Sequence, residues 1–190
     1  MSKSDIHLVD ETHEIGRQFR SVMRRLAGGV SIITAGRGDD ITGMTVTSLT
    51  SLSADPPRLL VSLNRQASSF GLIERNRTFG VNILGSDQQE IAGRFSNSGL
   101  RGKQRFEGAT WLAGSSGVPL LAKSVAAVEC QVEEIIERYS HAIVVGRLLS
   151  MNLAHQPSGL VYWNGQYLEI GHDDDLDLLA EVSVPLAHVR

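Results

Sequence analysis

An apolar stripe at helical spacing stands near the start of the chain. It consists of Ile15, Phe19, Val22, Met23 and Leu26, one every three or four residues, which predicts an amphipathic helix. Glycine accepts the left-handed conformation that ends many helices, so we expect this helix to end at Gly28-Gly29. The polar residues before the stripe predict a flexible segment over residues 1–12.

After the glycine pair the pattern changes to β-branched runs and to alternation of apolar and polar residues. Strands are expected at residues 30–35, 41–46, 58–63, 79–84, 126–132 and 141–149. In the fifth of these the even-numbered residues are apolar, whereas Glu129 and Gln131 are polar, which is typical of a strand with one buried face. Asn164-Gly165 fits a type I′ turn and predicts a hairpin over residues 160–168.

Short helices are expected between some of the strands. Phe70 and Ile73 give one of them an apolar side. Ser86 and Gln89 have the spacing of a capping box, which predicts a second helix that runs to about Phe95.

Two further segments lack the strand pattern. Residues 96–118 are rich in Gly and Ser and predict a long loop. The tail from His172 begins with three aspartates, and its pattern over residues 176–182 predicts an amphipathic helix.

Many short strands with few helices predict a mainly β fold with flanking helices. The expected architecture is one antiparallel sheet that closes as a barrel. We divide the chain into a flexible N-terminus (1–12), one domain (13–171) and an acidic C-terminal tail (172–190).

Composition excludes several classes of protein. Hydrophobic residues make up 42% and charged residues 21%, so the chain is not of a disordered type. The net charge of −3 argues against a nucleic-acid binder, which needs a cationic patch. No apolar run approaches a transmembrane length, so we expect no membrane association.

The single cysteine, Cys130, excludes an internal disulfide and a thiolate zinc site. Together with a polar start that lacks a secretory signal, it favours a cytoplasmic location. We expect no metal. The chain also lacks the dinucleotide-binding and phosphate-loop glycine patterns, the G-x-S-x-G motif and the His-Glu-x-x-His motif.

Residues 45–53 are unusually rich in hydroxyl side chains. Small hydroxyl and apolar residues leave the main chain uncovered, so this segment can cradle a flat polar heterocycle. By composition alone, the simpler interpretation is an edge strand that runs into a Ser/Thr loop.

Three other features have both a structural and a functional interpretation. Residues 64–69 open a helix, where Arg65 and free N–H groups suit a phosphate but simple capping by Ser68 is the more common case. His141 on a predicted strand has no metal-binding partner at suitable spacing. Tyr162, Trp163 and Tyr167 flank the predicted hairpin turn, as core pairs or as the lining of a ring-binding cleft.

Taken in order, these segments resemble the flavin reductase family, the NAD(P)H:flavin oxidoreductase component of two-component monooxygenases. The most specific part is the Gly-x-Thr…Ser…Ser-x-Ser…Pro-Pro pattern over residues 43–57, followed by Phe79-Gly80-Val81-Asn82-Ile83-Leu84. Weaker pieces are Phe19-Arg20, residues 26–34, Gly117-Val118-Pro119-Leu120-Leu121, Glu129-Cys130, His141 with Gly146, and Leu160-Val161-Tyr162-Trp163.

The resemblance implies a split β-barrel that binds FMN or FAD, as a homodimer with the flavin near the subunit interface. The residues expected at the isoalloxazine and ribityl chain are Thr45, Val46, Thr47, Ser48, Leu49, Ser51 and Leu52. Those expected near the flavin phosphate are Gln66, Ala67 and Ser68, and those at further flavin-contacting positions are Ser96, Arg105 and Phe106. On the nicotinamide side we expect His141, with Tyr162 and Trp163 as the aromatic contacts.

Three positions depart from the family pattern. Ser140 stands where Asp or Gly is frequent, Arg105 stands where Lys is frequent, and the tail past His172 lies outside the pattern. These departures bear on the preference between NADH and NADPH more than on the fold. No acidic or basic ribose selector is visible, and the choices between NADH and NADPH and between FMN and FAD both stay open.

The function implied is reduction of FMN or FAD by NADH or NADPH, which supplies reduced flavin to a separate monooxygenase. No residue is singled out as catalytic, since cofactor chemistry of this kind needs orientation more than a nucleophile. Two alternatives remain: a flavin-binding electron carrier and an FMN-dependent oxidase on the same scaffold.

Overall fold

The computed structural model describes residues 3–155 and 158–171. Its helices are α1 (Lys3–Met23), α2 (Ser68–Asn76) and α3 (Gln89–Ser96), with short 3₁₀ turns η1 (Ser86–Gln88) and η2 (Gly102–Phe106). Its strands are β1 (Gly28–Gly29), β2 (Ser31–Arg37), β3 (Asp40–Val46), β4 (Leu49–Ala54), β5 (Pro57–Asn64), β6 (Thr78–Ile83), β7 (Trp111–Ala113), β8 (Pro119–Leu121), β9 (Ala126–Arg138), β10 (His141–Leu153), β11 (Gly159–Trp163) and β12 (Gln166–Ile170).

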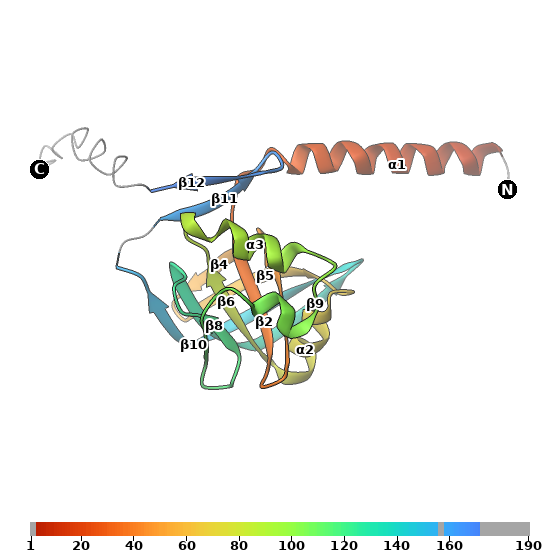
Figure 1. Cartoon of the computed structure of the whole chain (residues 1–190). Helices are drawn as coiled ribbons and strands as arrows, with labels where there is room; N and C mark the ends of the chain where they lie inside the picture. The colour runs from red at the N-terminus through yellow and green to blue at the C-terminus, as the bar shows by residue number, and fades with distance from the viewer. Residues whose placement is uncertain (1–2, 156–157, 172–190) are drawn as a thin grey trace, which may run out of the picture.

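One seven-stranded antiparallel sheet forms the body, in the order β3-β2-β6-β9-β10-β5-β4. Its two edge strands, β3 and β4, follow each other in the chain and are joined only by Thr47 and Ser48. Because two residues cannot span a flat sheet of this width, the sheet curls until its edges approach (Figure 1). The result is a barrel split between β3 and β4, which confirms the predicted mainly β class.

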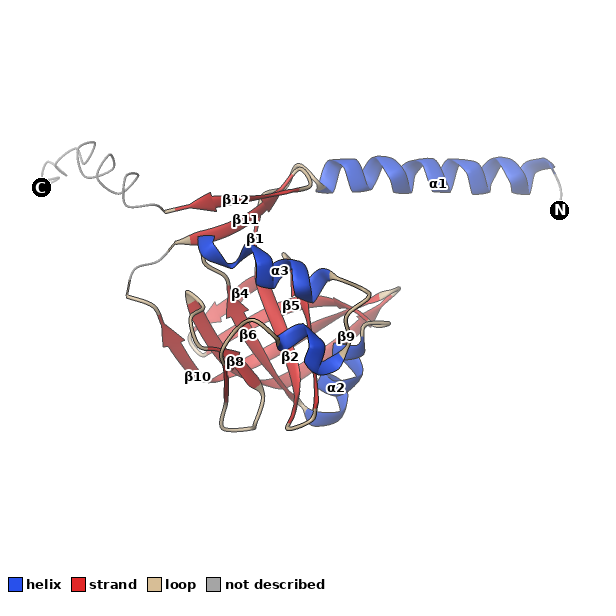
Figure 2. Cartoon of the chain, in the orientation of Figure 1, coloured by secondary structure: helices blue, strands red, loops and turns tan. Residues whose placement is uncertain are grey.

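Residues that alternate along the strands build a core on each face of the sheet. Ile33, Val61 and Phe79 belong to the inner cluster, where α2 adds Phe70. The neighbouring Ile32 points to the other face, because successive strand residues alternate. There it joins a cluster under α3, η2 and β11, and Figure 2 shows α3 lying across the strands.

The glycine pair does not end the first helix, so that prediction is wrong. Helix α1 ends at Met23, and Gly28–Gly29 forms β1, which pairs with β11. A Cβ atom on Gly28 would lie 2.9 Å from the Cβ of Thr47, so close approach explains this glycine. The helix begins at Lys3, earlier than the stripe indicated, and the flexibility expected of residues 1–12 stays a prediction.

Two predicted segments differ in detail. The capping box lies one residue earlier, because the side chain of Gln88 accepts from the Gly85 N–H at 2.9 Å and donates to the Lys123 carbonyl at 2.9 Å. The stretch 96–118 is not one loop, since η2 and β7 form within it. The helix predicted over residues 176–182 lies outside the described residues.

None of the helices within residues 3–155 and 158–171 is long and apolar enough to cross a membrane.

Glu129 on β9 was expected to face solvent, but its side chain is fully buried. It accepts hydrogen bonds from the Ser115 N–H and hydroxyl at 2.9 Å each, and from the Ser116 N–H at 2.7 Å. Burial raises the pKa of this carboxyl, but the hydrogen bonds from Ser116 and Ser115 outweigh it and lower the pKa to about 2. A buried carboxylate thus anchors the β7–β8 turn to β9.

We expect Glu129→Gln to lower the free energy of unfolding at pH 7 by about 2–3 kcal/mol, because an amide NH₂ would then meet a backbone donor. The depressed pKa stabilises the wild type above pH 4.5, and this contribution is lost as the pH falls towards 2. The difference in free energy of unfolding between wild type and variant should therefore become smaller as the pH falls from 4.5 towards 2. Urea titrations at several pH values measure the free energy of unfolding. Glu134→Gln, on the exposed side of the same strand, is the control. A difference that does not depend on pH would contradict the assignment.

Candidate ligand-binding site

Three adjoining cavities run along β3, and we call them together the β3 trough. The wide end, about 580 Å³, lies beside residues 40–42, the middle, about 460 Å³, beside residues 43–45, and the narrow end, about 250 Å³, beside Thr45 and Thr47. Neighbouring cavities share lining residues, so the trough is continuous. Its other walls are the start of α2 and the segment from α3 to η2.

The middle of the trough meets the N-terminus of α2. Ala67 is the N-cap residue, and no side chain caps the helix. Ser69, only 1% exposed, lines the middle cavity, and its hydroxyl has no hydrogen-bond partner in the described chain. Free N–H groups and the positive end of the helix dipole favour an anion at this place.

Arg105 from η2 lies opposite the start of α2 and lines both the middle and the wide cavity. Its guanidinium donates to the Phe95 carbonyl, while its Nε is buried and has no partner in the described residues. Burial lowers the pKa of this guanidinium, which nevertheless stays charged at neutral pH. The middle of the trough is therefore a cationic pocket that favours an anion.

Aromatic rings line the narrow end. Tyr162 on β11 and Tyr167 on β12 are cross-strand partners, and their rings pack edge to face with centroids 5.4 Å apart. Both line the narrow cavity together with Thr45, Thr47 and Ser96. Aromatic faces beside hydroxyl groups suit a flat polar ring.

The structure brings about half of the predicted flavin-contacting residues together. Those that line the trough are Thr45, Thr47, Gln66, Ala67, Ser68, Ser96 and Arg105. The side chain of Val46 lies in the core, Leu49 packs against it, and Phe106 stacks in an aromatic cluster with Phe95. Their side chains therefore pack in the core next to the trough and do not line it.

Three other predicted residues lie at the split. The Ser48 hydroxyl donates to the Ser62 carbonyl at 2.8 Å, which fixes the β3–β4 turn to β5. Ser51 and Leu52 lie exposed on the edge strand β4.

The residues predicted on the nicotinamide side are separated. Tyr162 lines the narrow end. Exposed His141 at the start of β10 pairs in register with Asn64, which lines the middle cavity. Trp163 instead donates from its indole to the Arg25 carbonyl at 3.1 Å and fixes the turn that follows α1.

Sequence reasoning missed several residues of the trough. Tyr167 was named only as a core pair or a possible cleft lining beside the hairpin turn, and the Asn-Gly turn sets it directly across from Tyr162. Asn64 and Ser69 belong to the helix-opening segment 64–69, which the sequence marked as suited to a phosphate without naming either side chain. No sequence signal pointed to Ser98 or Arg101, which lie between α3 and η2.

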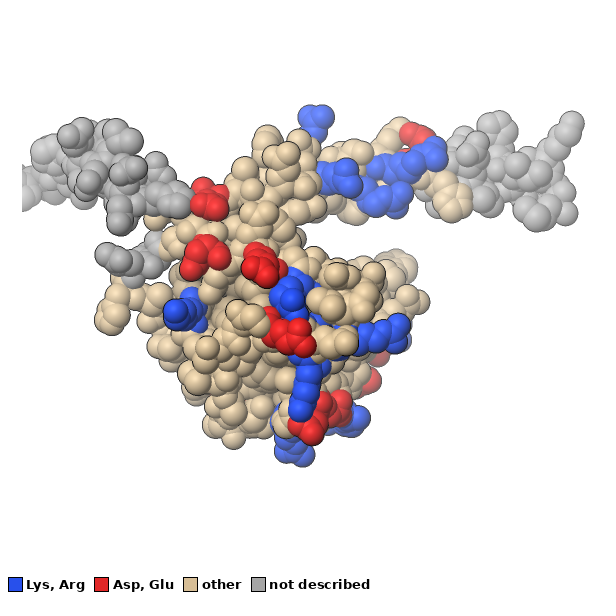
Figure 3. Space-filling view, in the orientation of Figure 1, with Lys and Arg blue, Asp and Glu red and all other residues tan. Residues whose placement is uncertain are grey.

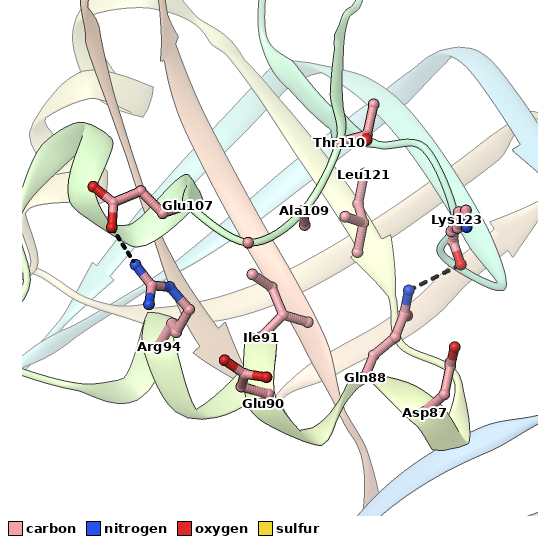
Figure 4. Close-up of a pocket in the computed structure, with 11 residues that line it drawn as sticks. Asp87, Gln88, Glu90, Ile91, Arg94, Glu107, Ala109, Thr110, Leu121 and Lys123 are labelled. Atoms are coloured by element: carbon pink, nitrogen blue, oxygen red, sulfur yellow. Dashed lines mark hydrogen bonds and ion pairs between the residues drawn. The ribbon is translucent and has the colours of Figure 1, made fainter.

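A separate hollow of about 250 Å³ lies beside α3, between η1 and the segment after η2 (Figure 4). Two contacts join residues of its lining: Arg94 bonds Glu107 at 3.0 Å, and Gln88 bonds the Lys123 carbonyl at 2.9 Å. None of the residues predicted for the site lines it. Within the described parts of the chain, no three His, Cys, Asp or Glu side chains are grouped so that they could hold a metal ion.

Comparison with known proteins gives consistent matches. The model of the flavin reductase like domain matches residues 23–171. The reductase subunit HsaB of a flavin-dependent monooxygenase from Rhodococcus jostii is 32% identical over 157 residues, which cover 83% of this chain and 79% of HsaB. The FMN reductase (NADH) RutF from Pseudomonas syringae is 32% identical over 149 residues, 78% of this chain and 83% of RutF.

A solved structure extends the likeness to three dimensions. The NADH:FAD oxidoreductase SgcE6 from Streptomyces globisporus, in complex with NAD and FAD fragments, superposes with a TM-score of 0.75 at 29% identity. The match covers 82% of this chain and 93% of SgcE6.

Proposed function

Because the chain belongs to the family of the flavin reductase like domain, we propose that it is an NAD(P)H:flavin oxidoreductase whose flavin lies in the β3 trough. The observation that carries this proposal is the trough itself: a cationic pocket with unpartnered donors in the middle and an aromatic, hydroxyl-lined cavity at one end. A flavin has the same order of groups, with a flat ring, a polyhydroxyl chain and a phosphate.

The residues present fit such a molecule. The unpartnered Ser69 hydroxyl, the buried Arg105 Nε and the open N-terminus of α2 would hold the phosphate. Thr45, Thr47 and Ser96 would hold the ribityl chain and the polar edge of the ring, and Tyr162 and Tyr167 would pack on it.

When bound, the flavin accepts a hydride from a reduced nicotinamide and carries the electrons away from the site. The protein supplies binding and orientation. Thr45 is rigid, because its hydroxyl donates to the Ala92 carbonyl of α3 at 2.6 Å. The Ser48–Ser62 hydrogen bond fixes the following turn in the same way, so this wall is preorganised.

We assign His141 to the nicotinamide. Its Nδ1 lies 2.9 Å from the Ser140 hydroxyl, which leaves Nε2 free to bond a carboxamide or a phosphate. Tyr162 is the aromatic contact on the same side, whereas Trp163 holds the turn that follows α1.

The reduced flavin would pass to a separate monooxygenase, as the names of HsaB and other relatives indicate for those proteins. We place the protein in the cytoplasm, where its single, buried cysteine stays reduced.

Aerobic oxidation of NADH or NADPH by the purified protein should depend on added FMN or FAD. The rate of oxidation is measured from the absorbance of the reduced nicotinamide, with and without each flavin. The proposal is overturned if neither nucleotide is oxidised with either flavin. Tightly held flavin without nucleotide oxidation would favour the electron carrier, and oxygen consumption without any nucleotide would favour the oxidase.

His141→Ala should raise the KM for the reduced nucleotide about tenfold, while the Kd for flavin changes much less, since one charge-assisted or neutral hydrogen bond is lost. Steady-state kinetics and flavin fluorescence titration measure the two constants. His155→Ala, an exposed histidine away from the trough, is the matched control. A larger effect on flavin than on nucleotide would remove the assigned role.

We also propose that the protein is a homodimer held by α1. This helix projects from the curled sheet beside the β11–β12 hairpin (Figure 1), and Phe19 and Val22 are 60% and 64% exposed. Basic side chains gather along the same helix and the turn that follows it (Figure 3). Arg17 and Arg20 belong to the helix, and Arg24 and Arg25 to the turn. A long amphipathic helix is stable in water only when its apolar face is covered, and a second copy offers the same stripe by symmetry.

Val22→Asp should weaken dimerisation by at least about a hundredfold, because a carboxylate would be buried without a partner. Analytical ultracentrifugation over a range of concentrations measures the dissociation constant of the dimer. Ser21→Asp adds the same charge at the adjacent position and should leave the dimer intact. An unchanged dimer in the Val22 variant would show that α1 is not the interface.

A further inference from the structure

The wide end of the β3 trough is not used by the groups assigned so far. With the ring at the narrow end and its phosphate at α2, FMN would stop in the middle cavity. The wide cavity continues beyond this point along residues 40–42, and it shares Gln66, Ala67, Ser68, Ser98 and Arg105 with the middle one. Its volume of about 580 Å³ lies within the ~300–1,000 Å³ typical of small-molecule sites.

The lining of the wide end suits a heterocycle attached to a sugar. Ile41, Leu72 and Leu100 supply aliphatic surface from three separate elements. Asp40 and Ser98 lie at the same cavity and can bond ribose hydroxyls or an exocyclic amine.

The charges around this cavity leave a second arginine, in addition to Arg105, without an acidic partner in the described chain. Asp40 forms an ion pair with Arg75, and Asp39 forms one with Lys103. Arg101, which is exposed and lines the wide cavity, has no ion-pair partner among the described residues. A second phosphate next to the one at α2 would lie between Arg101 and Arg105.

We propose that the wide end of the β3 trough binds the adenosine monophosphate half of FAD, so that FAD rather than FMN is the preferred flavin. This inference rests on the proposed function, because it takes the trough as the flavin site. The length agrees: residues 40–45 span roughly 17 Å at ~3.4 Å per strand residue, so an extended dinucleotide can lie along β3. The names of the relatives do not decide the question, since RutF is an FMN reductase and SgcE6 acts on FAD.

The test compares flavin affinities of the full chain by isothermal titration calorimetry. Wild-type protein should bind FAD at least about tenfold more tightly than FMN. Arg101→Gln should raise the Kd for FAD about tenfold and leave that for FMN unchanged, because FMN has no phosphate near this residue. Lys103→Gln, a neighbour whose charge is already paired with Asp39, is the matched control and should leave both constants unchanged. Circular dichroism confirms that each variant is folded.

Each contrary result has a distinct meaning. Equal wild-type affinity for FMN and FAD, or an equal loss of both in the Arg101 variant, would overturn the preference for FAD and leave the reductase function standing. A raised KM for NADH with an unchanged Kd for FAD would also overturn it, because the adenosine half would then belong to the nicotinamide dinucleotide. Binding of neither flavin would overturn the proposed function as well.

Discussion

The two-residue connection between β3 and β4 constrains the rest of the structure. It joins the opposite edges of a seven-stranded sheet, so the sheet must curl, and the barrel must remain split where the edges meet. The Ser48 hydroxyl bonds the Ser62 carbonyl and fixes this connection to β5. Since β3 is an edge strand, its far side is free to face the start of α2 and the α3–η2 segment rather than another strand. The trough is therefore a direct consequence of the open barrel.

Close packing of α3 gives the trough a rigid wall. A Cβ atom on Gly43 would lie 2.7 Å from the Phe95 ring and 2.7 Å from the Ile33 carbonyl, so only glycine lets α3 approach β3 this closely. Two residues further along β3, the Thr45 hydroxyl donates a hydrogen bond to the Ala92 carbonyl of α3. Behind this contact, Phe95, Phe106 and Trp111 pack their rings together. Phe106 thus matters to the site through the position of its neighbour Arg105.

Local patterns predicted the elements, whereas tertiary contacts decided where the prediction failed. The strand β9 and the Asn-Gly hairpin are encoded within a few residues, and both formed as expected. Glu129 follows the alternation by sequence, yet the β7–β8 turn folds over it and supplies its hydrogen bonds. Gly28 likewise depends on Thr47, far away in the chain. The hydroxyl-rich segment marked one wall of the site, but Ser98 and Arg101 reach it only because the segment between α3 and η2 folds against β3.

The charge distribution explains how an acidic chain can hold an anionic ligand. The net charge is −3, so the protein as a whole repels a nucleotide weakly. Most basic side chains near the trough are neutralised locally, as Lys103 is by Asp39 and Arg75 by Asp40. Arg101 and Arg105 have no acidic partner among the described residues, and Arg105 is partly withdrawn from water. Attraction of an anion at this point therefore depends on two guanidinium groups and one helix end rather than on the overall field. Salt screens the partly buried Arg105 less than the exposed Arg101.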